Sequence, residues 1–407
     1  MLKAFKYRIN PNEEQKVLLA KHFGSVRFVF NKFLNERQTA YNENNKAFSN
    51  YNLDSAKLTE LKKNEQFAWL KEVNSQSLQF ALKCLDTAYQ NFFKKKADFP
   101  NYKNKNSKQS FCVPQSVRLE NNNLSIPKFK DPIKVVVHRK FNGTIKQCTI
   151  SKSPSGYYYV SVLVDTVHIL KPKTGLVVGI DLGVKDFAIT SDGYKYKNNR
   201  YMKTYAKKLK AAQQHLSRKV KDSNRYNKQK IKVARLHEKI ANSRKDNLHK
   251  VSTDLINKYD VIVLEDLNVK GMVKNHKLSK HISDASWGSF VAMLQYKAAW
   301  NEKTVQIIDR WFPSSKTCGC CGYINQNLSL KDREWTCPSC NTKLDRDFNA
   351  AKNILKEGLR NFKNISAGTA DNKHGDQISP SSDGTVCEVL KAQLHLAAEA
   401  HKSLACG

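Results

Sequence analysis

Two C-x-x-C pairs near the end of the chain constrain its fold more than any other feature. Cys318 and Cys321 form the first pair, Cys337 and Cys340 form the second, and fifteen residues separate them. This spacing is typical of a four-cysteine zinc site, because each pair forms a tight turn and the four thiolates converge on one tetrahedral ion. We expect the intervening residues to form a short hairpin. Cys320 falls between two ligands and is expected to be a spare thiol.

The predicted Zn²⁺ ion is structural. Four protein ligands close the coordination sphere and leave no position for a catalytic water, so the ion is expected to support folding rather than hydrolysis. The chain has 10 cysteines, five of them between Cys318 and Cys340. This clustering favours metal binding over a set of disulfides.

The chain carries a large positive charge. Its 70 lysines and arginines outnumber its 36 aspartates and glutamates, which gives a formal net charge of +34 at pH 7. Such a charge repels itself unless a polyanion lies against it, so nucleic acid is the expected partner. No apolar run approaches the roughly 18 residues that a membrane-spanning helix needs, and no signal peptide follows Met1. We therefore expect a cytoplasmic protein with no membrane partner.

Hydrophobic patterning predicts a multidomain α+β protein, because 407 residues with 40% hydrophobic side chains can form two or three cores. Alternating and short β-type runs predict a small antiparallel β-barrel from residues 1–10 and 98–172. Helical periodicity predicts a helical domain at 11–97, inserted into that barrel.

The second half of the chain is expected to form an α/β domain, interrupted by the cysteine module and followed by a tail. The ranges are 173–310 and 344–365 for the domain, 311–343 for the zinc insert and 366–407 for the tail. Gly, Ser, Asp and Asn dominate the tail, which is expected to be disordered except for a weakly helical stretch from Val386 to Leu404.

Acidic residues are scarce, so an aspartate in an apolar strand needs a reason, since an unpaired buried carboxylate costs several kcal/mol. Asp181 is predicted in the middle of such a strand and Glu265 at the end of another. The stretch 344–351 offers a third acid where a strand meets a helix. Three carboxylates can hold two divalent ions for phosphodiester hydrolysis, and oxygen ligands favour Mg²⁺ or Mn²⁺. The alternative is that each acid caps a helix or pairs with a lysine.

Two basic segments are candidates for contact with nucleic acid. A connector at 99–111 interleaves lysines with aromatic residues, which suits phosphate contact and base stacking. The range 201–258 is predicted to be a helical hairpin, interrupted near Ser223, with seventeen lysines and arginines against four acids. An ordinary solvated loop and a charged helical surface are the alternatives. The connector candidates are Tyr102, Lys103, Lys105, Lys108 and Gln109.

The order of the motifs resembles the TnpB family of insertion-sequence proteins. The motifs are Gly-Ile-Asp-Leu-Gly at 179–183, Leu-Glu-Asp-Leu at 264–267, Ser-Ser-Lys-Thr-Cys at 314–318 with the two C-x-x-C pairs, and Asp-Arg-Asp-x-Asn-Ala-Ala at 345–351. Similar motifs near the amino terminus and in the connector extend the resemblance from residue 1 to about residue 365. Leu344 departs from the family, where many relatives have histidine, and so does the additional Cys320.

The resemblance implies an RNA-guided DNA endonuclease related to the type V CRISPR effectors. Such a protein binds a guide RNA from the right end of the transposon, recognises a short motif beside the target and cuts double-stranded DNA. A partner transposase encoded by the same element would fit this setting. The implied fold is an RNase H-like (RuvC-type) nuclease domain, preceded by a wedge-like barrel and a helical recognition domain.

The resemblance also implies roles for individual residues. Asp181, Glu265 and Asp347 match the catalytic triad, which would hold two Mg²⁺ or Mn²⁺ ions, with Asp345 and Arg346 as supporting neighbours. Arg346 is also a candidate for nucleic-acid contact. Further candidates, for reading the target-adjacent motif, are Gln76, Gln79 and Lys83.

Two other functions remain open from the sequence. The same carboxylates could serve a transposase that breaks and rejoins DNA, because an RNase H-like core does not distinguish hydrolysis from strand transfer. A catalytically silent RNA-guided repressor would need the basic surfaces and the zinc but not the three acids.

Overall fold

The computed structural model describes residues 1–44, 50–106, 108–276, 279–329 and 331–366, so the predicted tail and its weak helix lie outside the described residues. The chain divides into two compact units. Unit 1 comprises Met1–Ile169 and Leu209–Glu238, and unit 2 comprises Leu170–Lys208 and the chain from Lys239 onward.

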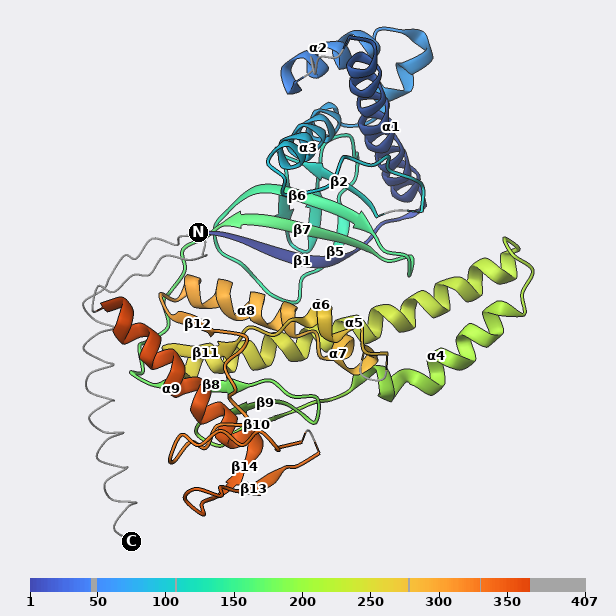
Figure 1. Cartoon of the computed structure of the whole chain (residues 1–407). Coiled ribbons are helices and arrows are strands. Elements are labelled where there is room, and N and C mark those ends of the chain that lie inside the picture. The colour runs from blue at the N-terminus through green and yellow to red at the C-terminus, as the bar shows by residue number, and fades with distance from the viewer. Residues whose placement is uncertain (45–49, 107, 277–278, 330, 367–407) are drawn as a thin grey trace. The chain divides into compact units, whose positions relative to one another are not determined.

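Unit 1 is built on a seven-stranded sheet in which every pair of neighbours is antiparallel. The first strand lies between two strands from later in the sequence (Figure 1). Alternation in this strand buries Phe5, Tyr7 and Ile9 and exposes the residues between them to solvent on the other face. The sheet order is β2(Gln109–Val113), β6(Thr144–Lys152), β7(Tyr158–Asp165), β1(Leu2–Asn10), β5(Ile133–Val136), β4(Asn123–Ser125) and β3(Arg118–Glu120).

Helices form within the range 11–97, and they share a hydrophobic core with this sheet. Its elements are α1(Glu13–Asn44), α2(Tyr51–Leu61), η1(Glu65–Glu72) and α3(Ser75–Phe93). A reciprocal capping box starts α1, since Gln15 N–H donates to Asn12 Oδ1 (2.8 Å) and Asn12 N–H donates to Gln15 Oε1 (3.0 Å).

The predicted basic hairpin consists of α4(Tyr201–Ser217) and α5(Asn224–Lys258). Residues 209–238 of this hairpin belong to unit 1. Glu238 accepts hydrogen bonds from the hydroxyls of Tyr159 (2.8 Å) and Ser155, and the Arg235 guanidinium lies over the Tyr157 ring at 5.0 Å. These contacts fix the middle of α5 to the β6–β7 turn.

Unit 2 contains a mixed five-stranded sheet. Its order is β10(Lys195–Lys197), β9(Asp186–Thr190), β8(Val177–Asp181), β11(Val261–Glu265) and β12(Thr304–Ile308). The first three strands pair antiparallel, and β8, β11 and β12 are parallel. The helices α6(Val269–Met272), α7(Ser279–Ala285) and α8(Trp287–Trp300) follow β11.

Helices cover both faces of this sheet. In β11, Ile262 and Leu264 belong to a core shared with α5 and α8, whereas Val261 and Val263 pack with Ile354 of α9(Arg346–Ser366). The same alternation in β8 places Val178 and Ile180 on the face of the sheet that α5 and α8 cover. Figure 1 shows α9 running along the sheet beside β8 and β11. Parallel strands buried on both faces explain why these segments read as unbroken apolar runs.

Two glycines let α9 approach the sheet backbone. A Cβ atom at Gly179 of β8 would lie 2.2 Å from the carbonyl oxygen of Ala351, and one at Gly358 of α9 would lie 2.4 Å from Val263 Cγ1. A side chain at either position would push the helix away. The Gly-Ile-Asp motif therefore contains a packing residue two positions before its aspartate.

The cysteine module forms two small hairpins, which corrects one expectation. The residues between the pairs do not form a single hairpin. Instead, a Thr317–Ile324 bridge encloses the first pair, and β13(Glu334–Thr336) with β14(Lys343–Asp345) encloses the second. Each C-x-x-C turn is thereby clamped by its own flanking strands.

No helix in the described ranges is both long enough and apolar enough to span a membrane.

Candidate active site and metal centre

The four predicted cysteine ligands lie together. Cys318 Sγ is 3.7 Å from Cys340 Sγ, Cys321 Sγ is 3.6 Å from Cys337 Sγ, and all four sulfur atoms lie within 4.8 Å of one another. Zinc–thiolate bonds of about 2.3 Å in a tetrahedron imply sulfur separations of about 3.8 Å. The cluster can therefore hold one structural metal ion such as zinc.

The four thiols differ in burial, since Cys318 and Cys337 are buried, Cys340 is half-buried and Cys321 is exposed. Cys318 and Cys337 pack with Trp335, and Cys320 is exposed and does not belong to the cluster, as expected for a spare thiol. Hydrogen bonds from the side chain and backbone of Thr342 lower the pKa of Cys340 to about 6. A thiolate is thus favoured at one ligand position near neutral pH.

Two of the predicted catalytic acids end neighbouring parallel strands. Asp181 is the last residue of β8, not its middle, because Gly183 turns the chain toward β9 by donating its N–H to the carbonyl of Phe187 (3.3 Å). Glu265 is the last residue of β11. Leu264 pairs with Ile180, so the register carried one residue further places Glu265 beside Asp181. By strand alternation both side chains belong to the face that α9 covers.

The third acid, Asp347, lies in the first turn of α9, where a negative charge complements the helix dipole. Two arginines hold its carboxylate. Arg333 Nη1 lies 3.0 Å from Asp347 Oδ2, and Arg346 Nη2 lies 3.0 Å from Oδ1. Arg346 is therefore committed, at least in part, to positioning this acid.

The electrostatics of these acids reflect crowding in a poorly solvated place. Burial and, to a smaller extent, the charges of Glu265 and Asp347 raise the pKa of Asp181 to about 7, against the opposing charges of Arg346 and Arg333. Burial also raises the pKa of Glu265, against a hydrogen bond from the Ser314 hydroxyl. A cation between these carboxylates would relieve their repulsion.

The carboxylates are less tightly gathered than the thiols. Within the described ranges, the cysteines are the one group of three or more acidic, histidine or cysteine side chains that could hold a metal ion as they stand. Mutual repulsion and the two arginines on Asp347 account for the looser arrangement.

Two buried asparagines near these acids were not predicted from the sequence. Asn353 of α9 donates to the carbonyls of Ser314 (2.8 Å) and Thr317 (2.7 Å), and Asn349 donates to Thr317 O (2.7 Å) and accepts from Gly319 N–H (2.9 Å). Both asparagines are buried. They join α9 to the segment that carries Ser314 and the first cysteine pair. Their four-residue spacing on an amphipathic helix was the available signal.

The candidates on α3 lie along one helix at positions compatible with a single face. Gln76 and Gln79 are half-buried and Lys83 is exposed. Gln76 Nε2 donates to Gln115 Oε1 (2.9 Å), so the amide nitrogen of Gln76 already has a partner within the protein.

The connector candidates do not all face solvent. Lys105 and Lys108 are exposed, but the Lys103 amine lies over the Phe30 ring at 3.7 Å, and burial lowers its pKa. Gln109 accepts a hydrogen bond from Arg27 (3.0 Å). Lys103 is thus turned inward, so part of the predicted basic surface is used for packing.

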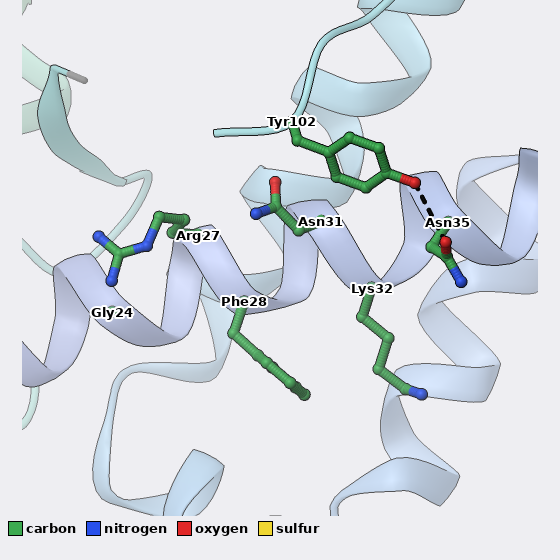
Figure 2. A pocket seen from close by; sticks show the side chains of 7 residues that line it. All are labelled: Gly24, Arg27, Phe28, Asn31, Lys32, Asn35 and Tyr102. Carbon is green, nitrogen blue, oxygen red and sulfur yellow. Dashed lines mark hydrogen bonds between the residues drawn. The ribbon is translucent and has the colours of Figure 1, made fainter. Parts of the chain in front are cut away.

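Tyr102 lines a cavity of about 450 Å³ along α1 (Figure 2). Its hydroxyl hydrogen-bonds to Asn35 Oδ1 (3.1 Å), and Asn31 exchanges two hydrogen bonds with the backbone of Lys103 (2.8 Å each). The connector is thereby anchored to α1. The complete lining is Gly24, Arg27, Phe28, Asn31, Lys32, Asn35 and Tyr102.

Three family models match the chain. One described as "Probable transposase" matches residues 159–276, one described as "Cas12f1-like, TNB domain" matches residues 287–354, and one described as "Helix-turn-helix domain" matches residues 1–46.

Two relatives align over most of their length. A Streptomyces pristinaespiralis protein named "Putative RNA-guided DNA endonuclease" is 41% identical over 361 residues, covering 88% of this chain and 89% of the relative. The Escherichia coli protein named "Putative RNA-guided DNA endonuclease InsQ" is 34% identical over 375 residues, covering 88% and 92%.

A solved structure shares the fold. It is described as "Cryo-EM structure of the Cas12f1-sgRNA-target DNA complex", and it matches with a TM-score of 0.53 and 13% identity over 87% of this chain and 98% of that chain. The expected multidomain architecture of helices and sheets is confirmed at this level.

Proposed function

The chain belongs to the TnpB (OrfB) family of insertion-sequence proteins, and from that premise we propose that it is an RNA-guided DNA endonuclease. Two relatives that align over most of the chain bear that activity in their names. The proposed reaction is the metal-dependent cutting of double-stranded DNA next to a short transposon-associated motif. Such an enzyme acts where the DNA is, at the nucleoid.

One observation supports the catalytic assignment above the others. Three acids from separate segments, Asp181, Glu265 and Asp347, interact electrostatically at one edge of the unit 2 sheet, where burial and their mutual repulsion raise the pKa of Asp181. Crowded acids with a raised pKa are typical of functional sites, and carboxylate oxygens suit divalent cations, so this crowding supports a site for such ions. We assign the sheet with α9 to an RNase H-like (RuvC-type) nuclease domain.

The three acids, the serine and the two arginines of this site have different proposed roles. Asp181, Glu265 and Asp347 would hold two Mg²⁺ or Mn²⁺ ions. Metal ions bound there would activate a water molecule and stabilise the leaving 3′-oxygen. Ser314 orients Glu265 through its hydroxyl, and Arg333 and Arg346 orient Asp347. With Asp347 on a metal, either arginine could instead contact a phosphate.

We assign the cysteine cluster to one structural Zn²⁺. The donor set of four thiols and their separations suit this ion. Its task is to shape the segment between β12 and α9, and so to place Ser314 and Arg333 near the acids.

The proposed partners are a guide RNA from the right end of the transposon and the double-stranded target. The chain's net charge of +34 suits two polyanions. Guide pairing would supply sequence specificity, and unit 1 would read the target-adjacent motif, with Gln76, Gln79 and Lys83 as candidates. A transposase encoded by the same element is a further proposed partner.

A strand-transfer transposase is the second candidate, because one matching family model is described as "Probable transposase". Strand transfer would join DNA ends without a guide. Joined products formed in the absence of guide RNA would favour it.

The deciding experiment is cleavage with the element's own RNA. We would co-express the chain with the right-end RNA, purify the complex, and incubate it with guide-matched plasmids carrying a randomised flank in Mg²⁺. Asp181→Ala should lose activity by a factor on the order of 10³ or more. Asp246→Ala removes an exposed carboxylate of α5 and should cut normally.

The outcomes separate the candidate functions. Linear plasmid with wild type and Asp246→Ala, but not with Asp181→Ala, is the expected result, and the linear products reveal the flanking motif. Target binding without cutting by any of the three proteins would refute the nuclease assignment and indicate a repressor.

A further inference from the structure

Trp311 is the most exposed tryptophan that the structure describes. It lies in the segment that joins β12 to the cysteine module, and 84% of its surface is exposed. Tryptophan side chains are ordinarily mostly covered, because an indole is the largest apolar group a protein can bury. A tryptophan left this open on a folded surface is a candidate contact for a partner.

The loop that carries Trp311 is held in place on both sides. Arg310 pairs with Asp266, and its Nε donates to the Asp266 carbonyl (3.3 Å). Trp311 N–H donates to Asp309 Oδ1 (2.7 Å). On the other side, the Ser314 hydroxyl bonds Glu265. The indole is therefore presented by an ordered backbone, which lowers the entropy that a partner must overcome on binding.

This loop lies at the edge of the sheet that carries the acids. Strand β12 runs parallel to β11, and Ile308 pairs with Glu265. Trp311 follows Ile308 by three residues, so it extends from the same strand ends as the carboxylates. Asp266 and Glu265, the anchors of the loop, are consecutive residues. The loop that carries the indole therefore adjoins the acids in the structure.

We propose that Trp311 stacks on a base of the single-stranded DNA that enters the carboxylate site. This inference rests on the proposed function. Every base has an aromatic face, so stacking on an indole holds a strand without reading its sequence. A single-stranded segment is required, since bases within a duplex already stack on one another. Trp311 is then a substrate contact that fixes the position of the strand during cutting.

The first test compares cleavage by guide-RNA complexes of wild type, Trp311→Ala and Trp311→Phe. With a saturating amount of complex over target, Trp311→Ala should cut roughly tenfold more slowly, because one stacking contact contributes about 1–3 kcal/mol. Trp311→Phe should retain most of the rate, since a phenyl ring still stacks. Target binding should stay unchanged, because the guide pairing is intact. The indole is exposed, so neither substitution should alter the melting temperature.

The second test does not depend on cleavage. A single-stranded oligodeoxythymidylate should quench part of the tryptophan fluorescence of the full chain, and Trp311→Phe should lose that part. Trp69→Phe is the matched control, because Trp69 is also exposed (38%) but lies in unit 1. Trp69→Phe should show the same Trp311-dependent quenching as wild type.

The outcomes keep this inference separate from the proposed function. If wild type cuts and Trp311→Ala cuts equally fast, the stacking role is overturned and the nuclease stands. If wild type does not cut but quenching depends on Trp311, the nuclease assignment fails and the single-strand contact stands. If quenching is equal in wild type and Trp311→Phe and the cleavage rates are equal as well, the stacking role is overturned. The exposed indole would then be expected to contact a protein partner.

Discussion

The imidazole of His22 joins two helices of unit 1 in a neutral form. Asn74 N–H donates to its Nε2 (3.1 Å), and its Nδ1 lies 2.8 Å from the Leu18 carbonyl, so Nδ1 carries the one proton. Burial lowers the pKa of His22 from its usual 6.5, and the charge of Lys128 lowers it further, against the hydrogen bond to Leu18. Protonation would remove the acceptor that holds the start of α3.

We expect His22→Gln to remove a pH-dependent part of the stability. The pKa is lower in the folded than in the unfolded chain, so the unfolded chain binds the extra proton first. The contribution is complete above pH 6.5 and is lost as pH falls from 6.5 toward the lowered pKa. Glutamine can donate and accept at this position without titrating.

Urea unfolding of both proteins between pH 5 and pH 8 measures this effect. Asp181 titrates in the same pH range in both proteins, so its contribution cancels. The difference in unfolding free energy between the two proteins therefore reports on His22 alone. The slope of that difference should not exceed about 1.4 kcal/mol per pH unit. A difference that does not change with pH would contradict a neutral, buried imidazole.

At the scale of single residues, the sequence identified positions with chemically distinctive spacing. The four cysteines meet as predicted, because C-x-x-C spacing is a local constraint. The buried asparagines Asn349 and Asn353 were missed because their partners, the carbonyls of Ser314 and Thr317, lie far from them in sequence. Asp181 was placed mid-strand because an apolar run does not show where the hydrogen-bonded ladder ends.

At the scale of elements, α9 depends on the absence of a side chain at Gly179. We expect Gly179→Ala to destabilise unit 2 by about 1–3 kcal/mol, because its methyl group would overlap the Ala351 carbonyl and displace the helix. Asp347 would move with α9, so cleavage should fall more than the loss of stability explains. Gly288→Ala is the matched control, since a Cβ atom there has nothing within 4 Å.

Thermal unfolding and cleavage rates of the two variants test this dependence. Gly288→Ala should be neutral or slightly stabilising, as alanine is favoured in helices. If Gly179→Ala melts and cuts as wild type does, the close approach of α9 to β8 has no role in forming the site.

Most helices and strands were predictable because their patterns extend over several turns or strand residues. The hairpin of α4 and α5 and the apolar strands β8 and β11 lie where the sequence pattern predicts them. The assignment of residues 209–238 to unit 1 was not predictable, because it depends on tertiary contacts such as Tyr159 with Glu238.

At the scale of the whole molecule, we expect the cysteine module and the carboxylate site to depend on one another structurally. Cys337→Ser should weaken metal binding, loosen the module and release Ser314 and Asn349 from their partners. We expect faster hydrogen exchange in residues 314–345 and at the start of α9, with β1 of unit 1 unchanged. Cleavage should fall although no catalytic acid has been altered.

Metal analysis and hydrogen exchange on the full chain measure this coupling. Cys320→Ser is the control, because Cys320 is exposed and does not belong to the cluster. It should retain the metal and the exchange pattern of wild type. Loss of metal from Cys337→Ser with unchanged exchange at α9 would show that the two sites are independent.

The position of Asp347 on α9 has a consequence for protein synthesis. Asp181 and Glu265 leave the ribosome well before this helix does, and until it arrives Val261 and Val263 have no cover on that face of the sheet. A nascent chain therefore has neither the third acid nor a finished nuclease core. Under the proposed catalytic assignment, a premature stop codon before α9 yields a fragment that cannot cut, so the cell is exposed to the nuclease only after nearly every described residue has been translated.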